Sequence, residues 1–560
     1  MLTLGIWSFG PDSSAVLLDD ASVLAAIEEE KLNRSSGAGG IPRLAIKWCL
    51  EQHGANLSDV EIVAFPGRLL RKALREAKFQ FRLGLSRPGA SDWTRSIGGT
   101  LREFAQLGEI RRLASKARSV LHLEHHLCHA ASAYYPSEFD RALILTLDEN
   151  GDMWSGLIAA GENEEIRPLR SLRFPNSLGW FHSRVTEFLG FRPRLDEHRV
   201  QWLGKDGRPE FVQAFRKLFR RGADGLPALE LRYFGRAAGG GSSFSSELGK
   251  ELGLDPAAIA SDPALRASLA RSARDVIEEM VLEIAAEFRK RTNMNSICLA
   301  GGLFLNVFLV RALETRGGFE RVYVQPVSGN SGTSLGAALL ARKHAGGKAR
   351  QRLSHLSLGP SFASAQIKPV LDNSKIIYKY LSGEEQLCAE VAQLLRRDKI
   401  VAWCQGRTEF GYRALGHRSI LASPFSEYVI ENVNTYIKHR QDFHPFGLSV
   451  PAEVASDLFE FSPNCNFMAS LGILKKDVPG LARFTFDGGQ VRVHVVEREA
   501  NPRFWRLLHK FGEYAPAPVL VNTSFNLFGE PLVSDPREAL RSFYCAGIDA
   551  LALGEFLLVK

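Results

Sequence analysis

The feature that most constrains the fold is a histidine-rich stretch at residues 125–134, which reads HHLCHAASAY, followed by the apolar run LILTL at residues 143–147. The first stretch predicts a helix that opens on its histidines, because small and apolar residues follow them without a helix breaker. The second predicts a buried strand that ends at Asp148, where a glycine turn follows. The order indicates an α/β protein with a carboxylate at a strand tip.

The histidines and this carboxylate are candidate metal ligands. Residues four apart on a helix share one face, so His125 and His129 can present two neutral imidazoles to one ion. Asp148 can complete the set. The alternative is a buried histidine pair that only hydrogen-bonds within the core, since the spacing lacks the glutamate of the zinc-protease motif. Cys128 points away from the shared face and is expected to pack in the core.

Strand–turn–strand patterns occur twice in the first part of the chain. The first joins residues 3–8 to residues 14–19 through GPDSS, and the second joins residues 143–147 to residues 154–159 around Asp148. Turns rich in backbone donors and hydroxyl groups suit phosphate oxygens. The two hairpins predict duplicated halves. After the first, residues 28–31 read EEEK and open a polar stretch with no assigned role.

The length of 560 residues exceeds what one core supports, so two or more domains are expected. A polar, basic stretch at residues 346–350 predicts a linker, and a second domain begins near Ala365. No run of eighteen apolar residues occurs and the start lacks a signal peptide, so we expect a cytoplasmic protein with no membrane contact. The seven cysteines form no CxxC pair, which argues against a thiolate zinc site and for a reducing compartment.

Lysine and arginine residues crowd residues 68–118 and contribute much of the net charge of +8. Such a run raises the hypothesis of nucleic-acid binding. The segment, however, has the apolar spacing of amphipathic helices and no RNA-binding fingerprint. Solvated helix faces near an anionic cofactor or substrate are therefore favoured over a nucleic-acid partner.

Three further motifs indicate nucleotide and anion binding. A glycine pair, Gly301-Gly302, follows a predicted strand at residues 296–300 and precedes a helix, an arrangement whose helix N-terminus suits phosphate. The turn GRTEFGYRALGHR at residues 406–418 carries Arg407, Arg413 and Arg418 with a single Glu409. Guanidinium groups can clamp phosphate or carboxylate groups, and the alternative is a structural ion-pair network around Glu409. The third motif, NTSFN at residues 522–526, follows a strand and suits a small polar group.

Together with NSLG at residues 176–179 and AGGLFLN at residues 300–306, these motifs run along almost the whole chain in a consistent order. The chain resembles the ATP-dependent O-carbamoyltransferases of antibiotic and nodulation-factor biosynthesis, whose members carbamoylate tobramycin, cephamycin and novobiocin precursors. The resemblance implies an N-terminal domain over residues 1–350 with the actin-like, hexokinase-like ATPase fold of the enzyme that makes threonylcarbamoyl-adenosine. It implies a C-terminal α+β, YrdC-like domain over residues 365–560.

The resemblance also implies an activity. The C-terminal domain would form carbamoyl-adenylate from carbamoyl phosphate and ATP, with release of phosphate and pyrophosphate. The N-terminal domain would transfer the carbamoyl group to a hydroxyl or amine of a specialised metabolite, beside a divalent metal for which the family implies iron(II). Adenylation creates a good leaving group, and a cation with aligned amides stabilises its charge. The partners are thus carbamoyl phosphate and a small-molecule acceptor, and homodimerisation stays open.

Family positions carry over residue by residue. The implied metal ligands are His125, His129 and Asp148. The implied adenosine loop is Gly301, Gly302 and Asn306. In the C-terminal domain the implied catalytic residues are Arg413, Arg418 and Lys438, and the implied nucleotide-binding residues are Arg407, Glu409, Arg492, Asn522, Ser524 and Asn526.

Several positions depart from the family pattern. Pro11 replaces a histidine of the first hairpin, and Asn330 replaces an aspartate that is a fourth metal ligand. His444 and Phe528 replace two arginines of the C-terminal domain. Asparagine can ligate a metal through its carbonyl but adds no charge. These changes leave two alternatives open: an adenylate-forming ligase that uses another carboxylate donor, and a non-catalytic homologue.

Overall fold

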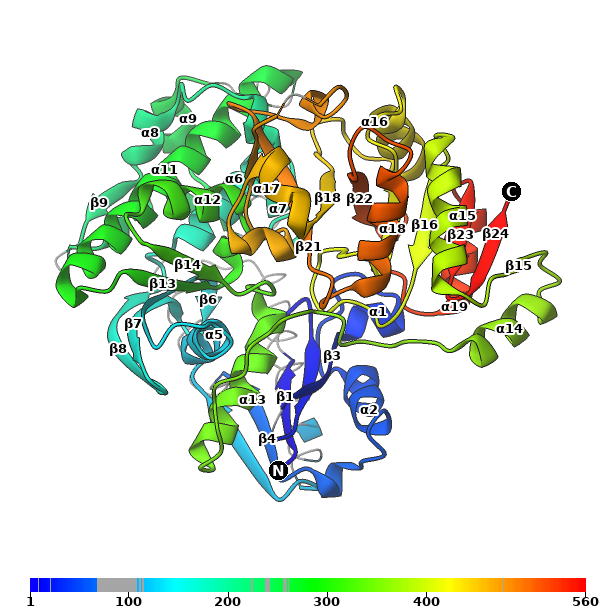
Figure 1. Ribbon diagram of the computed structural model, residues 1–560. Coiled ribbons are helices and arrows are strands. Elements are labelled where there is room, and N and C mark those ends of the chain that lie inside the picture. The colour runs from blue at the N-terminus through cyan, green and yellow to red at the C-terminus, as the bar shows by residue number, and fades with distance from the viewer. Residues whose placement is uncertain are drawn as a thin grey trace, which may run out of the picture. The chain divides into compact units, whose positions relative to one another are not determined.

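The computed structural model describes residues 1–8, 10–20, 22–67, 108–109, 112, 115–222, 225–236, 242–254, 259, 261–476 and 478–560. Two compact units are present (Figure 1): unit 1 comprises Met1–Leu24 and Gly37–Arg352, and unit 2 comprises Ala25–Ser36 and Leu353–Lys560. The segment Ala25–Ser36 falls in the predicted N-terminal domain by its position in the sequence, yet it belongs to unit 2. Most of the basic segment at residues 68–118 lies outside the described residues.

Unit 1 contains two five-stranded sheets with the same connectivity. Their strand orders are β3-β2-β1-β4-β5 and β8-β7-β6-β13-β14. The strands of the first are β1 (Thr3–Trp7), β2 (Ser14–Leu18), β3 (Val23–Glu28), β4 (Ile62–Pro66) and β5 (Ser119–Leu123). Those of the second are β6 (Arg141–Gly151), β7 (Trp154–Glu162), β8 (Glu165–Arg173), β13 (Ser296–Ala300) and β14 (Arg321–Val324).

The duplication extends to strand direction. β1 pairs antiparallel with β2 and parallel with β4, and β6 pairs antiparallel with β7 and parallel with β13. Each hairpin predicted from the sequence is the opening of one sheet. The prediction of an α/β protein with duplicated halves is confirmed for unit 1.

Helices join and cover these sheets. They are α2 (Arg43–Glu51), α5 (His125–Tyr134), α6 (Leu178–Phe188), α7 (Glu197–Leu203), α8 (Val212–Arg216), α9 (Ser246–Leu252), α11 (Pro263–Thr292), α12 (Val307–Arg316) and α13 (Thr333–His344). Two short hairpins, β9 (Phe219–Arg221) with β10 (Pro227–Leu229) and β11 (Phe234–Arg236) with β12 (Ser242–Phe244), lie between α8 and α9 in the chain. α13, whose residues are almost all buried, packs against α5 and β1.

Unit 2 is built on one ten-stranded sheet of order β15-β24-β23-β16-β17-β22-β18-β21-β20-β19. Its strands are β15 (Lys379–Tyr380), β16 (Val401–Cys404), β17 (Arg418–Ala422), β18 (Gly447–Pro451), β19 (Phe459–Glu460), β20 (Gly472–Leu474), β21 (Gln490–Val496), β22 (Leu520–Ser524), β23 (Ala550–Leu553) and β24 (Phe556–Val559). Its helices are α1 (Glu29–Asn33), α14 (Ser364–Asn373), α15 (Glu384–Arg396), α16 (Val429–Glu431), the π-helix η6 (Asn432–Ile437), α17 (Ala452–Leu458), α18 (Pro502–Gly512) and α19 (Pro536–Tyr544).

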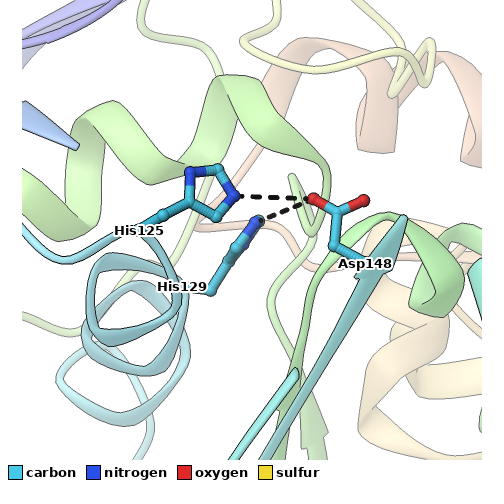
Figure 2. Close-up of side chains that lie close together, drawn as sticks. All are labelled: His125, His129 and Asp148. Carbon is cyan, nitrogen blue, oxygen red and sulfur yellow. Dashed lines mark hydrogen bonds and ion pairs between the residues drawn. The ribbon is translucent and has the colours of Figure 1, made fainter. Parts of the chain in front are cut away.

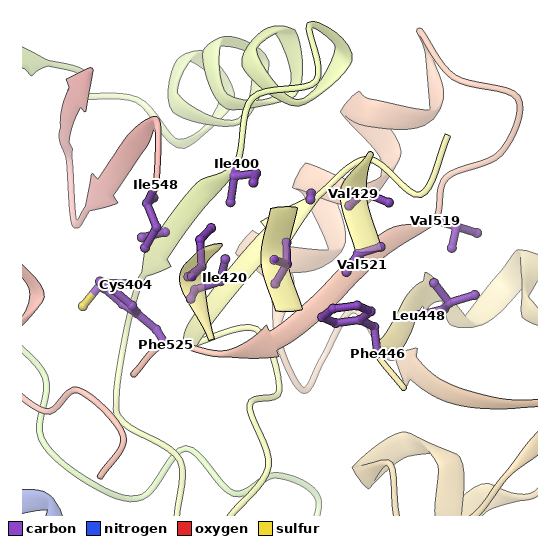
Figure 3. Close-up of a cluster of buried hydrophobic side chains, with 14 of the residues drawn as sticks. Ile400, Cys404, Ile420, Val429, Phe446, Leu448, Val519, Val521, Phe525 and Ile548 are labelled. Atoms are coloured by element: carbon purple, nitrogen blue, oxygen red, sulfur yellow. The ribbon is translucent and has the colours of Figure 1, made fainter. Parts of the chain in front are cut away.

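Both faces of the unit 2 sheet are buried, because successive strand residues point to opposite sides. In β16, Val401 and Trp403 enter the core that α15 and α18 cover, whereas Ala402 and Cys404 enter the other core. Figure 3 shows the second core, which α14, α16, η6, α17 and α19 cover. The sheet is thus a rigid platform for side chains at its strand ends. In the described part of the chain, no helix is long and apolar enough to span a membrane.

Candidate metal centre and cation cluster

In unit 1, α5 begins at His125 as the sequence predicts, because Glu124 caps the helix. Its carboxylate accepts hydrogen bonds from the backbone N–H groups of His126 and Leu127, at 3.0 and 2.6 Å. The i, i+4 spacing then directs His125 and His129 towards the tip of β6. There the pairing of β6 with β7 is interrupted between Leu147 and Gly151, which frees Asp148 from the regular ladder.

The two imidazoles converge on one carboxylate oxygen (Figure 2). Nε2 of His129 lies 3.3 Å, and Nε2 of His125 lies 3.6 Å, from Oδ2 of Asp148. All three residues are buried. Burial alone would raise the pKa of Asp148, but the contacts with His125 and His129 outweigh it and hold this pKa well below its usual value. The carboxylate is therefore ionised, as a metal ligand must be.

The donor set fits a divalent metal ion. One ligand atom from each of the three residues lies within 4.8 Å of the others. Nε2 of His125, Nδ1 of His129 and Oδ1 of Asn330 are buried and have no hydrogen-bond partner among the described residues. Buried polar atoms without partners are costly, so an ion ligated by this group would relieve that cost. Two imidazoles with oxygen donors suit iron, zinc or manganese.

His126, between the two candidate ligands, has a different role. Its Nδ1 lies 3.0 Å from Oγ1 of Thr146 and its Nε2 lies 3.1 Å from the carbonyl of Trp154. Both ring nitrogens are thereby engaged in fixing α5 to β6 and β7. Burial, followed by the neighbouring His125 and His129, lowers the pKa of His126 well below its usual value. Cys128 is fully buried, as expected for a packing residue.

The predicted adenosine loop lies against the same strand tip. A Cβ on Gly301 would meet the Leu147 carbonyl oxygen at 2.1 Å, and one on Gly302 would meet Oδ1 of Asp148 at 3.0 Å. Gly301 also has a φ of +101°, so both the contact with Leu147 and the backbone conformation exclude a side chain at this position. Asn306 caps α12 and accepts from the N–H groups of Phe308 and Leu309. The structure thus places this loop beside the metal centre, and its binding of adenosine stays a prediction.

Sequence reasoning missed one supporting residue of this centre. Ser177, in the NSLG motif, donates to the carbonyls of Asp148 and Glu149 at 3.0 and 2.8 Å. Its Oγ also accepts from the N–H of Trp180 and so caps α6. A capping serine just before a helix was the available signal.

In unit 2, the turn between β16 and β17 is organised around the buried Glu409. Its Oε1 accepts from the backbone N–H groups of Leu415, His417 and Arg418, at 2.8, 3.0 and 3.1 Å. The Arg418 guanidinium donates to the carbonyls of residues 360, 405, 406 and 417. Arg407 donates to the carbonyls of residues 358 and 359. These two arginines hold the backbone in place, and their direct contact with a substrate stays a prediction.

The other predicted cations gather on the sheet with one that sequence reasoning did not select. We call Arg413, Lys438, Arg440 and Arg492 the cation cluster. Burial and then the charge of Arg492 lower the pKa of both Arg413 and Arg440 to about 9. Burial lowers the pKa of Arg492 to about 10, and burial followed by Arg440 lowers that of Lys438 well below its usual value. Among the described residues, no carboxylate forms an ion pair with Lys438, Arg440 or Arg492.

Sheet register and one loop complete the cluster. Gly447 of β18 pairs with Arg492 of β21 on one side and with Asn522 of β22 on the other. Asn522 donates to the Ala414 carbonyl at 3.1 Å, next to Arg413. Separately, Nζ of Lys438 donates to the carbonyls of Ser524 and Asn526, both at 2.8 Å, and to Oδ1 of Asn526 at 2.6 Å. The predicted C-terminal residues are therefore brought together around surplus positive charge, which favours an anionic ligand.

Two of the departures from the family pattern differ in exposure. His444 is buried, with its ring stacked on Phe443 at 4.7 Å between centroids. Phe528 is 62% exposed on the loop that follows Asn526. Neither supplies the guanidinium group that the family pattern has at its position.

Comparison with known proteins finds family models and relatives that match this chain. A family model described as the carbamoyltransferase N-terminus matches residues 2–339, and one described as the carbamoyltransferase C-terminus matches residues 392–560. Nodulation protein NolNO of Sinorhizobium fredii is 31% identical, over 99% of this chain and 79% of its own length. Nodulation protein NolO of Bradyrhizobium diazoefficiens is 31% identical, over 78% of this chain and 79% of its own length. The protein sll1178 of Synechocystis is also 31% identical, over 100% of this chain and 96% of its own length.

Proposed function

Because this chain belongs to the carbamoyltransferase family, we propose that it forms carbamoyl-adenylate from carbamoyl phosphate and ATP in unit 2. In unit 1 it would transfer the carbamoyl group to a hydroxyl or amine of a small specialised metabolite. The observation that carries the proposal is the cation cluster, whose surplus charge on a rigid sheet suits a triphosphate. The matches to both family domains support it.

Adenylation requires one bond to form and one to break. Carbamoyl phosphate yields carbamate and phosphate by hydrolysis, and a carbamate oxygen attacks the α-phosphorus of ATP. The new oxygen–phosphorus bond replaces the bond to the β-phosphate oxygen, and pyrophosphate leaves with its charge. Arg413, Arg492 and Lys438 would stabilise the charge that develops on the phosphate oxygens, and Ser524 and Asn526 orient the Lys438 ammonium.

In unit 1, His125, His129 and Asp148 would hold a divalent metal, and Gly301, Gly302 and Asn306 would bind the adenosine. The metal, when bound, would act as a Lewis acid that polarises the carbamoyl group. The chain's own contribution is position: Glu124 and Ser177 fix the elements that carry these ligands. Iron(II) is the ion that the family resemblance implies.

The test is release of phosphate and pyrophosphate from ATP and carbamoyl phosphate by the purified protein. We expect both products without an acceptor, and a carbamoylated product by mass spectrometry when an acceptor is added. Silence under all conditions would support a non-catalytic homologue and contradict the proposal.

A second candidate is an adenylate-forming ligase that uses another carboxylate donor. The replacement of two family arginines by His444 and by the exposed Phe528 favours it, because these positions would otherwise add charge for a phosphorylated donor. Pyrophosphate release that depends on an added carboxylate, and not on carbamoyl phosphate, would distinguish this candidate.

A further inference from the structure

The segment Ala25–Ser36 comes from the start of the chain but is part of unit 2. It contains the end of β3 and the short helix α1 (Figure 1). Three of its charged residues, Glu28, Lys31 and Arg34, contact two loops that carry residues of the proposed adenylation site. The polar EEEK stretch, unassigned in the sequence, therefore has specific partners.

Glu28 and Lys31 both hydrogen-bond to the backbone of the segment Glu409–Gly411. Nζ of Lys31 donates to the carbonyls of Glu409 and Gly411 at 2.8 and 2.7 Å, and lies 2.6 Å from Oε2 of Glu28. Oε1 of Glu28 accepts the N–H of Gly411 at 2.7 Å. Both polar backbone groups of Gly411 are thus held by this pair, and Glu28 and Lys31 are 1% and 2% exposed.

This backbone segment belongs to the arginine turn at residues 406–418. Gly411 has a φ of +105°, a conformation that suits glycine, and Arg413 follows two residues later. The Glu409 carboxylate accepts hydrogen bonds from the N–H groups of residues 415, 417 and 418, in the later part of the same turn. In the chain, Arg413 therefore lies between two fixed backbone segments. Glu28 and Lys31 hold the one before it, and Glu409 holds the one after it.

Arg34 holds a second loop. Its guanidinium donates to the carbonyls of Pro531 and Leu532 at 2.9 and 2.7 Å, and lies 3.2 Å from the carboxylate of Glu538. That loop begins at Asn526, whose amide donates to the Glu530 carbonyl at 2.6 Å and whose Oδ1 receives Lys438. One short segment thus contacts the supports of both Arg413 and Lys438.

We propose that Glu28 and Lys31 are positioning residues that fix the Glu409–Arg413 backbone so that the Arg413 guanidinium stays directed at the phosphates during adenylation. The inference rests on the proposed function. A buried ion pair adds little net stability, because desolvation offsets the attraction, but it restricts geometry. Displacement of a catalytic group by about 1 Å can lower a rate about 100-fold. Loss of Lys31 alone leaves the Glu28 carboxylate buried without its partner and lowers folding stability as well, so its effect on turnover has to be measured per folded molecule against a destabilised control.

The experiment compares Lys31→Met, Lys31→Arg and Leu395→Ala in the full chain. Leu395 is a fully buried residue of α15 in the core that α15 and α18 cover, and the cluster of buried hydrophobic residues to which it belongs includes none from the turn at residues 406–418. Its truncation is therefore expected to lower stability without removing the contacts of Lys31. We expect Lys31→Met to lower kcat for pyrophosphate release about 10- to 100-fold with a smaller change in the KM for ATP, and Lys31→Arg to recover most of the loss. Amide hydrogen exchange in residues 409–418 should rise in Lys31→Met only.

Equal kcat losses per folded molecule in Lys31→Met and Leu395→Ala would overturn the inference, as would unchanged exchange in the turn. If the unmodified protein releases no pyrophosphate, the proposed function fails separately. The inference is then decided by calorimetric binding of inorganic pyrophosphate to the same variants. Weaker binding in Lys31→Met with recovery in Lys31→Arg supports it, and identical binding overturns it.

Discussion

The metal centre and the cation cluster are built in opposite ways. The candidate metal centre takes its predicted ligands from α5 and β6, two consecutive elements separated by six residues of chain. The cation cluster draws its members from a turn, the end of η6 and β21, spread over residues 413–492. A local centre depends on helix spacing, whereas a dispersed cluster depends on the register of a whole sheet.

The two sites also differ in charge. In the candidate metal centre one carboxylate faces two imidazoles, so with neutral imidazoles the site carries one negative charge. In the cation cluster burial, and after it a neighbouring positive group, lowers the pKa values of Arg413, Lys438 and Arg440. The charge of the first site suits a cation, and the charge of the second suits an anion. If the two sites serve separate steps, changes in one should leave the other intact.

The largest effect is expected for Arg413→Met. Removing one charge-stabilising donor from a desolvated site costs about 10²- to 10³-fold in rate, so pyrophosphate release should fall by this factor. Arg413→Lys should recover only part of it, because an ammonium lacks the planar fork. Metal content measured by mass spectrometry should stay unchanged. Wild-type rates in Arg413→Met would remove this residue from the adenylation site.

A smaller effect, confined to the other site, is expected for His129→Ala. Loss of one of three protein ligands should abolish tight metal binding and lower carbamoyl transfer about 100-fold, while pyrophosphate release persists. The matched control is His126→Gln on the same helix, whose parent side chain bonds Thr146 and Trp154 and should not affect metal content. Equal loss of adenylation and transfer in His129→Ala would contradict the separation of the two sites.

The same contrast explains what could be predicted from the sequence. The helix start, the strand and the convergence of His125, His129 and Asp148 follow from periodicity and a single turn. The duplicated halves followed from two hairpins, and each hairpin opens a sheet of the same connectivity. Metal binding itself stays a prediction.

The cluster in unit 2 was harder to predict for a physical reason. Arg407, Arg413 and Arg418 share one motif. The guanidinium groups of Arg407 and Arg418, however, donate hydrogen bonds to backbone carbonyls. Which arginine faces the sheet depends on turn conformation, which spacing does not reveal. Arg440 was missed because its neighbour Arg492 is brought near by tertiary structure. No local sequence pattern indicates that Ala25–Ser36 belongs to unit 2, because its partners lie several hundred residues later in the chain.

Acidic pH should lower the folding stability of unit 2 through His494, which lies on β21 two residues from Arg492. Burial, then His417 and Arg492, lower the pKa of His494 to about 3. The unfolded chain, with an ordinary value near 6.5, binds this proton more readily, so stability is full above about pH 6.5 and falls as pH drops towards 3. The total loss is on the order of 5 kcal/mol. His494→Gln should flatten the slope of unfolding free energy against pH, measured with denaturant. An unchanged slope would exclude His494 as its source.

The smallest effect is expected at the edge of the metal centre, for Asn330→Asp. The Asn330 side chain lies near His129, and its amide oxygen is buried. A carboxylate at this position would add a negative charge to a set that now has one, so metal affinity should rise about tenfold. Chelator competition with iron(II) or zinc measures the change, and Asn330→Ala provides the control because it removes the oxygen without adding charge. If both variants bind the metal as the unmodified protein does, Asn330 does not face the ion. The centre is then the three-residue set of α5 and β6 alone, which makes its contrast with the dispersed cluster sharper still.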